Sequence, residues 1–269
     1  MTGDMDGTLD GGTRCVISRS ADAKIARSAD DSAASASYGR EVTDQRSTDM
    51  TARLHDRFFA ACGILFVVLE LGGAFAAMGT GKTHSLTISS TTSDIASAIA
   101  HPVGTGTWIG AYMEVVSVCF FLAFAVWVTE RLGGGLLGSV GRLAATANAG
   151  ATLVSLGIGD AISYEAGRGL SVPIARMFVT VNEAVYVCTW FAAAGFLAAV
   201  GLLALRAGRR VAGWSAVAIV ALTLVLTPLS LDNLGQMTQL LWLVWAVCVS
   251  VGLARAPRSA RATALVAGA

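Results

Sequence analysis

The chain has little charge. Of its 269 residues 14% are charged and 54% are hydrophobic, and the mean hydropathy is +0.64, whereas soluble domains carry roughly 25% charged residues. This composition argues against a soluble enzyme and indicates a polytopic membrane protein. The net charge of +1, with no basic groove carrying interleaved aromatic residues, argues against a nucleic-acid partner.

Proline, cysteine and histidine are also scarce. Four prolines argue against a proline-rich disordered chain, and five cysteines without paired spacing argue against a disulfide framework. The three histidines, at positions 55, 84 and 101, lie outside every predicted span, so haem and zinc sites that need imidazoles at fixed depth are not supported. The stretch 76–83 (AAMGTGKT) matches a relaxed phosphate-loop pattern but follows a predicted transmembrane helix, so we expect no nucleotide site and no cofactor.

The charge that is present lies mainly in the first segment. Residues 1–57 hold 18 of the 37 charged side chains, eight basic and ten acidic. Residues 1–49 are rich in Ser, Asp, Ala and Thr without a sustained apolar period, so we expect a disordered N-terminal tail. Met50 is an alternative start, because MTARLHDRFFAACG is typical of a short basic entry into a first helix.

The remainder predicts a membrane domain over residues 50–255, followed by a short cytoplasmic tail at 256–269. A transmembrane helix needs about 20 apolar residues, and lipid leaves no alternative to helices or closed barrels. We therefore expect an all-α polytopic bundle of six transmembrane helices. The six apolar runs are 58–78, 108–128, 136–159, 177–205, 211–229 and 234–254.

Basic residues predict the orientation of this bundle. With the N-terminus inside, ten arginines flank the spans on the cytoplasmic side, against Lys82, Arg168 and Arg176 on the other. This bias predicts that both the N- and C-termini are cytoplasmic, in a bacterial cytoplasmic membrane. The cytoplasmic arginines are Arg53, Arg57, Arg131, Arg142, Arg206, Arg209, Arg210, Arg255, Arg258 and Arg261.

Three further features refine the arrangement. Trp127 and Trp214 are expected in the inner aromatic belt, with Trp108, Tyr112 and Tyr164 in the outer one. The glycines of the third span, at 135, 138, 141, 150, 157 and 159, predict that this helix lies inside the bundle. A short amphipathic helix is expected near residues 93–100, in the first outer loop.

The acidic residues suggest a site. Five carboxylates occur in or beside the spans, and acids inside a membrane are costly and point to function by default. At ~1.5 Å per residue, all five fall in the extracytoplasmic half. They are Glu70, Glu114, Asp160, Glu183 and Asp232.

Small and polar residues share faces with these acids. Glu114 lies on one face with Gly110 and Ser117, and Glu70 with Gly63, Gly73 and Ala77. With Asn182, Asn233 and Gln239, they predict an outward-facing acidic vestibule. Carboxylate and amide oxygens suit a small hard cation, a proton or an amine ligand.

A structural role for the acids is the alternative. Asp232 at the start of the last span is a natural helix cap. Asp160 is equally consistent with a loop position, and Glu183 lies two turns after Arg176, a spacing suited to an ion pair.

Residues 58–255 also resemble a broad group of uncharacterised six-helix integral membrane proteins of high-GC bacteria. The resemblance rests on loose patterns, which are LELGGAFAAMGTG, WIGAYMEVVSVCFFLAFAVWV, ERLGGGLLGSVGRLAATANAGA, RAGRRVAGWSAVAIV and LLWLVWAVCVSVGL. It implies a six-helix fold and no particular activity.

Three functions are compatible with these observations. The first is a transporter-like or solute-binding membrane protein that uses the acidic vestibule. The second is a non-catalytic accessory or interaction protein whose acids are structural. The third is an intramembrane enzyme with Glu114 and Glu183 as an acid–base pair, which no nucleophile or metal set supports.

Overall fold

The computed structural model describes residues 50–51, 53–77, 86–226 and 234–255, of which 234–237 are described in backbone only. The chain divides into two units, Met1–His55 and Asp56–Ala269, and the second contains α2 to α7 and all but the first three residues of the Arg53–Ala77 helix. The expectations for the tails 1–49 and 256–269 lie outside the described residues.

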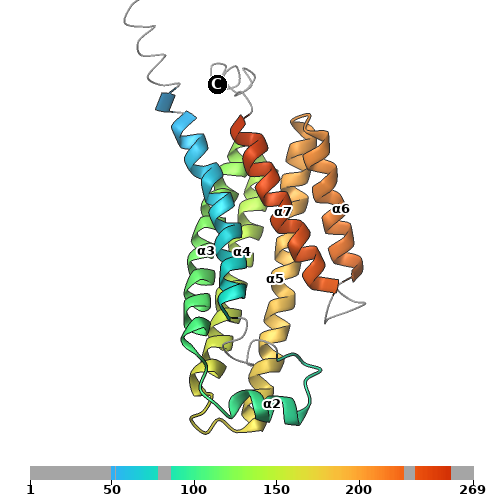
Figure 1. Ribbon diagram of the computed structural model, residues 1–269. Helices are drawn as coiled ribbons and strands as arrows, with labels where there is room; N and C mark the ends of the chain where they lie inside the picture. The colour runs from blue at the N-terminus through green and yellow to red at the C-terminus, as the bar shows by residue number, and fades with distance from the viewer. Residues whose placement is uncertain (1–49, 52, 78–85, 227–233, 256–269) are drawn as a thin grey trace, which may run out of the picture. The chain divides into compact units, whose positions relative to one another are not determined.

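The described part of the chain is helical and contains no strand, which confirms the all-α prediction (Figure 1). Within the described residues each predicted apolar run overlaps one helix, and four helices are long and apolar enough to span a membrane: Arg53–Ala77, α3, α5 and the Thr238–Arg255 part of α7. The elements are Arg53–Ala77, α2 (Thr92–Ile99), α3 (Thr105–Arg131), α4 (Gly135–Glu165), α5 (Val172–Arg206), α6 (Arg210–Leu226) and α7 (Leu234–Arg255).

The helices extend beyond the apolar runs at several ends. α4 continues to Glu165, so the loop interpretation of Asp160 is wrong. The extension is stabilised by burial, because Ile162 and Ser163 are 3% and 2% exposed. α5 begins at Val172, after Ser171 and with Pro173 in its first turn, a position where proline's missing N–H costs nothing. Hydropathy marks where a helix is apolar, not where its backbone hydrogen bonding stops.

The short helix expected near residues 93–100 is present as α2. Thr91 and Asp94 form a reciprocal capping box at its N-terminus. On its apolar face, Ile95 and Ile99 belong to a buried cluster with Ile162, Ala175 and Val179. In Figure 1, α2 lies at the end of the bundle where α5 begins and α4 ends, in agreement with its contacts to both helices.

The Arg53–Ala77 helix and α3 approach each other closely through glycine. A Cβ added to Gly73 would lie 2.8 Å from Cγ of Glu114 and 3.0 Å from the carbonyl oxygen of Gly110. A Cβ on Gly110 would lie 2.6 Å from the carbonyl oxygen of Gly73. The two small-residue faces that the sequence predicts separately therefore pack on each other.

Further along the same helix pair, a buried carboxylate joins the two helices. Asp56 is 7% exposed; its Oδ1 accepts a 3.1 Å hydrogen bond from Nε1 of Trp127, and its Oδ2 lies 3.6 Å from Nε of Arg131. Trp127 is itself only 3% exposed, so its assignment to an aromatic belt is wrong. The indole is inside because its N–H has a carboxylate partner there.

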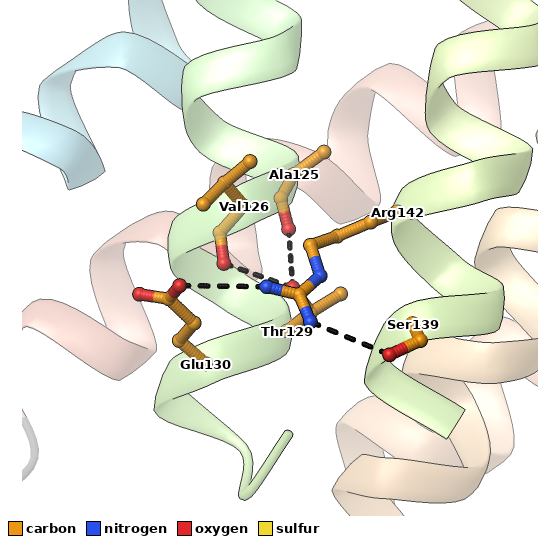
Figure 2. Close-up of polar contacts among 6 residues, drawn as sticks. All are labelled: Ala125, Val126, Thr129, Glu130, Ser139 and Arg142. Atoms are coloured by element: carbon orange, nitrogen blue, oxygen red, sulfur yellow. Dashed lines mark hydrogen bonds and ion pairs between the residues drawn. The ribbon is translucent and has the colours of Figure 1, made fainter. Parts of the chain in front are cut away.

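An ion pair crosses the turn from α3 to α4, and further polar contacts lie within the two helices beside it (Figure 2). NH1 of Arg142 lies 3.6 Å from Oε1 of Glu130, and its NH2 lies 3.4 Å from the Ser139 hydroxyl. The Thr129 hydroxyl lies within hydrogen-bonding distance of the carbonyl oxygens of Ala125 and Val126. The turn is compact because Gly133 and Gly134 adopt positive φ angles of 113° and 56°.

The α5–α6 hairpin is equally tight. A Cβ on Gly213 would lie 2.5 Å from Cγ of Leu205 and 2.9 Å from the carbonyl oxygen of Gly201. In α4, by contrast, Gly150, Gly157 and Gly159 have nothing within 4 Å of an added Cβ, and Gly150 and Gly157 are exposed. The prediction that the α4 glycines mediate packing is therefore wrong for these three.

An aromatic cluster links four helices at the centre. Phe66, Phe121, Phe196 and Trp242 lie with ring centroids 5.3–5.9 Å apart in five of their pairwise contacts. Large apolar side chains also cover the outside: Phe75, Val154 and Val244 are 69%, 54% and 61% exposed. Apolar surface outside an aromatic core is what a lipid environment favours, so the fold is compatible with an integral membrane protein.

Candidate functional site

A cavity of about 90 Å³ with both polar and apolar lining residues lies among the helices. Every long helix contributes to its wall, which makes it a central feature of the fold. A volume of this size holds a few water molecules and is well below the ~300–1,000 Å³ of pockets for drug-sized ligands. The lining residues are Phe66, Glu70, Val118, Phe121, Asn148, Thr152, Tyr186, Thr189, Trp190, Ala193, Leu197, Thr223, Thr238, Gln239, Trp242 and Leu243.

Glu70 is the carboxylate in this wall. Its Oε2 lies 2.8 Å from the hydroxyl oxygen of Ser117 in α3, and Ser117 is completely buried. The same hydroxyl lies 2.7 Å from the backbone carbonyl oxygen of Glu114. A serine has one hydroxyl hydrogen for these two contacts.

This geometry accommodates Glu70 in both protonation states. When the carboxylate is ionised, the Ser117 hydroxyl donates to it. When Glu70 is protonated, the carboxyl donates to the Ser117 oxygen, and Ser117 donates to the Glu114 carbonyl. Because the hydroxyl hydrogen can point either to Glu70 or to the Glu114 carbonyl, Ser117 can serve Glu70 as donor or acceptor by rotation of its hydroxyl group alone.

Aromatic and amide groups form another part of the wall. The Tyr186 hydroxyl donates to Oε1 of Gln239 over 2.7 Å, joining α5 to α7. The indole N–H of Trp190 is buried and lies close to Tyr186, but it meets hydrogen-bonding geometry with none of the described residues. A buried donor of this kind is costly, and it offers a contact to water or to a bound solute.

α4 contributes neutral polar groups. Asn148 and Thr152, four residues apart on one face, both line the cavity, and the amide of Asn148 donates to the carbonyl oxygen of Thr189 over 2.8 Å. Among the residues that the structure describes, the cavity wall therefore combines one carboxylate with hydroxyl and amide groups.

The structure places the predicted site residues at different distances from the cavity. Glu70 and Gln239 line it. Glu114 is partly buried beside it, packed against Gly73, and it is close enough to Glu70 and Asp160 to interact with both electrostatically. Glu183 is partly buried and interacts electrostatically with Tyr186, as Glu70 and Glu114 do.

Asn182 does not line the cavity and is hydrogen-bonded to a neighbouring helix instead. Its Oδ1 accepts a 2.8 Å hydrogen bond from Ser155, joining α4 to α5. Arg176, the expected partner of Glu183, lies 3.3 Å from the carbonyl oxygen of Ser90 and 3.2 Å from the Thr92 hydroxyl. These contacts attach α5 to the N-terminal end of α2.

The structure describes only part of the predicted set of site residues. Asp232 and Asn233 lie outside the described residues. Within the described part of the chain, no three His, Cys, Asp or Glu side chains are grouped closely enough to hold a metal ion.

The sequence interpretation missed Tyr186, Trp190, Asn148 and Thr152. The spacing of Asn148 and Thr152 was an available signal, since polar residues four apart share a helix face. Tyr186 and Trp190 share that spacing too, but aromatic residues in an apolar run are as typical of a core. Comparison of the chain with protein-family models, curated proteins and solved structures found no match.

Proposed function

We propose that this protein is a six-span integral membrane protein of a bacterial cytoplasmic membrane, with both termini on the cytoplasmic side. The ten-to-three distribution of basic residues supports the orientation. α4 has 31 residues, more than the ~20 that a span needs, although Arg142, Asn148 and Asp160 lower its hydropathy. α6 has 17 mostly apolar residues in total within the described range, close to the length required.

We further propose that the central cavity binds a proton or a small monovalent cation, an inorganic ion or a protonated amine, as part of a solute-binding or transport function. The observation that carries this proposal is the position of Glu70 in a cavity walled by every long helix. A site shared by all the helices is one that relative helix movement would open or close.

Charge and size favour this class of ligand. A buried carboxylate in a low-dielectric bundle is stabilised by one neutralising positive charge. When ionised, Glu70 supplies one negative charge in the wall, and the other polar lining groups among the described residues are neutral. The ~90 Å³ volume limits the ligand to a few heavy atoms.

The Ser117 geometry supports exchange of a proton for the cation. A bound cation requires the ionised carboxylate, which Ser117 stabilises as a donor. Loss of the cation leaves a charge that protonation removes, and Ser117 then accepts from the carboxyl. We therefore expect cation binding and proton release at Glu70 to be coupled.

Thermal unfolding tests the site. Purified wild-type protein in detergent is heated with increasing sodium, ammonium or methylammonium chloride, with choline chloride to hold ionic strength constant. We expect one of the small cations to raise Tm for the wild type and not for Glu70→Gln. The glutamine keeps an oxygen acceptor for Ser117, so folding should survive.

Glu165→Gln is the matched control, because Glu165 is an exposed acid at the end of α4. It should retain the cation effect. A cation response that persists in Glu70→Gln, or that also disappears in Glu165→Gln, would contradict a site at Glu70.

An accessory role with structural acids is the second candidate, favoured by the hydrogen bonds that join the helices. Ser117–Glu70, Tyr186–Gln239 and Ser155–Asn182 each connect two helices. Polar pairs of this kind stabilise membrane bundles by about 0.6 kcal/mol on average. Uniform destabilisation by substitutions at Glu70, Glu114 and Glu183, without any cation response in the wild type, would favour this candidate.

A further inference from the structure

A second cavity, of about 360 Å³, lies at the opposite end of α5 from α2, beside the α5–α6 turn. Its walls are mainly apolar and come from α5, α6 and α7, with Leu132 at the end of α3. The lining residues are Leu132, Val200, Ala204, Arg209, Arg210, Val211, Ala212, Ser215, Trp245, Cys248, Val249, Gly252 and Leu253.

The apolar wall is fixed in place by the helix packing. Nε1 of Trp245 donates to the carbonyl oxygen of Ala212 over 3.1 Å, which holds α7 against the first turn of α6. Gly252, by contrast, has nothing within 4 Å of an added Cβ. The hydrogen-bonded indole of Trp245 therefore forms one side of the groove, and the space beside Gly252 of α7 is open.

Two arginines at the α5–α6 turn give the groove a charged end. Arg209 is half-buried and Arg210 is exposed, and neither takes part in an ion pair with any residue that the structure describes. Arg210 also opens α6, where the first-turn N–H groups have no intrahelical acceptor and favour a negative charge. Two cations and a helix N-terminus at one end of an apolar groove are complementary to an anionic headgroup with an acyl chain.

Neighbouring side chains indicate how deep in the bilayer this end of the groove lies. Val211 and Trp214 are 86% and 62% exposed in the first turns of α6. Exposed tryptophan is enriched at the level of lipid headgroups. The arginines beside it therefore lie where a phosphate of the bilayer would be.

We propose that this groove binds one anionic phospholipid, with its phosphate at Arg209 and Arg210 and an acyl chain along α7 past Gly252. Basic pockets between transmembrane helices are suited to such headgroups. The site is separate from the central cavity, with which it shares no lining residue. Its occupation holds α5, α6 and α7 together.

Lipid binding is measured by native mass spectrometry and by Tm in detergent, with phosphatidylglycerol or phosphatidylcholine of the same acyl chains. We expect wild-type protein to retain one phosphatidylglycerol and to gain stability from it, with a weaker response to phosphatidylcholine. Inorganic phosphate should give no comparable stabilisation, because it lacks the chain. Equal responses to the two lipids, or full stabilisation by phosphate alone, would overturn the proposal.

Variants separate the headgroup from the chain. Arg209→Gln combined with Arg210→Gln should weaken phosphatidylglycerol binding by about 30-fold. Arg206→Gln is the matched control, an exposed arginine at the same turn that does not line the groove, and it should bind nearly as the wild type does. Equal weakening in the control would overturn the proposal, because it would indicate a general charge effect.

Gly252→Leu tests the apolar part of the groove. A Cβ at Gly252 meets nothing within 4 Å and the leucine side chain would occupy the groove that Gly252 lines, so we expect the protein to fold and to lose about tenfold in binding while both arginines remain. Unchanged binding in this variant would overturn the placement of the chain. A lipid-independent dimer that Gly252→Leu dissociates would overturn it too, since the occupant would then be a second copy.

Discussion

Oε2 of Glu70 and the hydroxyl oxygen of Ser117 lie 2.8 Å apart, joining the Arg53–Ala77 helix to α3 beside the central cavity. The two residues are 47 positions apart in the sequence. The contact links the packing of these helices to the protonation state of Glu70, the one carboxylate among the described residues that line the cavity.

Ser117→Ala should destabilise the protein by about 1 kcal/mol and weaken the cation response, because it leaves Glu70 without its hydroxyl partner. Ser250→Ala is the control, since Ser250 is equally buried and lies 2.7 Å from a carbonyl oxygen of its own helix. Chemical denaturation in detergent gives the stability, and cation-dependent Tm gives the response. A normal response in Ser117→Ala would show that Ser117 is only a packing residue.

Gly73→Ala should destabilise the protein by about 1–3 kcal/mol, because its Cβ would overlap Glu114 and the Gly110 carbonyl. Gly157→Ala, in open space on α4, should be neutral or stabilising by up to about 1 kcal/mol, since alanine favours a helix more than glycine does. The Tm values of the two variants test this close packing at Gly73. An equal effect of both substitutions would contradict it.

Asp56→Asn should cost about 3 kcal/mol, because it removes the carboxylate that lies 3.6 Å from Nε of the largely buried Arg131. The asparagine still offers an acceptor to Trp127, so the loss reports mainly the ion pair. Glu130→Gln, which removes the more exposed pair with Arg142 (Figure 2), should cost at most about 1 kcal/mol. The unfolding free energies of the two variants test this ranking. A larger loss of stability in Glu130→Gln than in Asp56→Asn would contradict it.

Trp190→Phe should leave stability within about 1 kcal/mol of the wild type, because the buried N–H that it removes has no well-aligned acceptor among the described residues, which offsets part of the lost packing. Trp127→Phe should cost more, since its N–H is bonded to Asp56. Unfolding free energies measured in one detergent compare them directly. Similar losses in both would mean that the Trp190 N–H has a partner in solution.

Much of the helical fold was predictable, because long apolar runs allow few alternatives. The run 108–128 lies within α3, and the amphipathic pattern near residues 93–100 corresponds to α2. The helix ends were less predictable: α4 reaches Glu165 because burial of Ile162 stabilises its last turn, and a hydropathy window does not detect that contact.

The site was predictable only in part, for a related reason. An acid in an apolar run is conspicuous, so Glu70 and Glu114 could be selected by position. Nothing local indicates that Trp127 meets Asp56, which is 71 residues away, or that Asn182 is engaged by Ser155. Which polar side chains line the cavity depends on helix rotation, and the sequence restricts that rotation weakly where small residues occur on more than one face, as in α4.

The most direct test of the account is proton release on cation binding. Weakly buffered, detergent-solubilised protein near neutral pH is titrated with the cation that raises Tm, and the pH change is recorded for wild type, Glu70→Gln and Glu165→Gln. We predict proton release by the wild type and by Glu165→Gln that saturates with binding, and none by Glu70→Gln. Cation binding without proton release in the wild type, or equal release by Glu70→Gln, would contradict the assignment of Glu70 as the exchanging group.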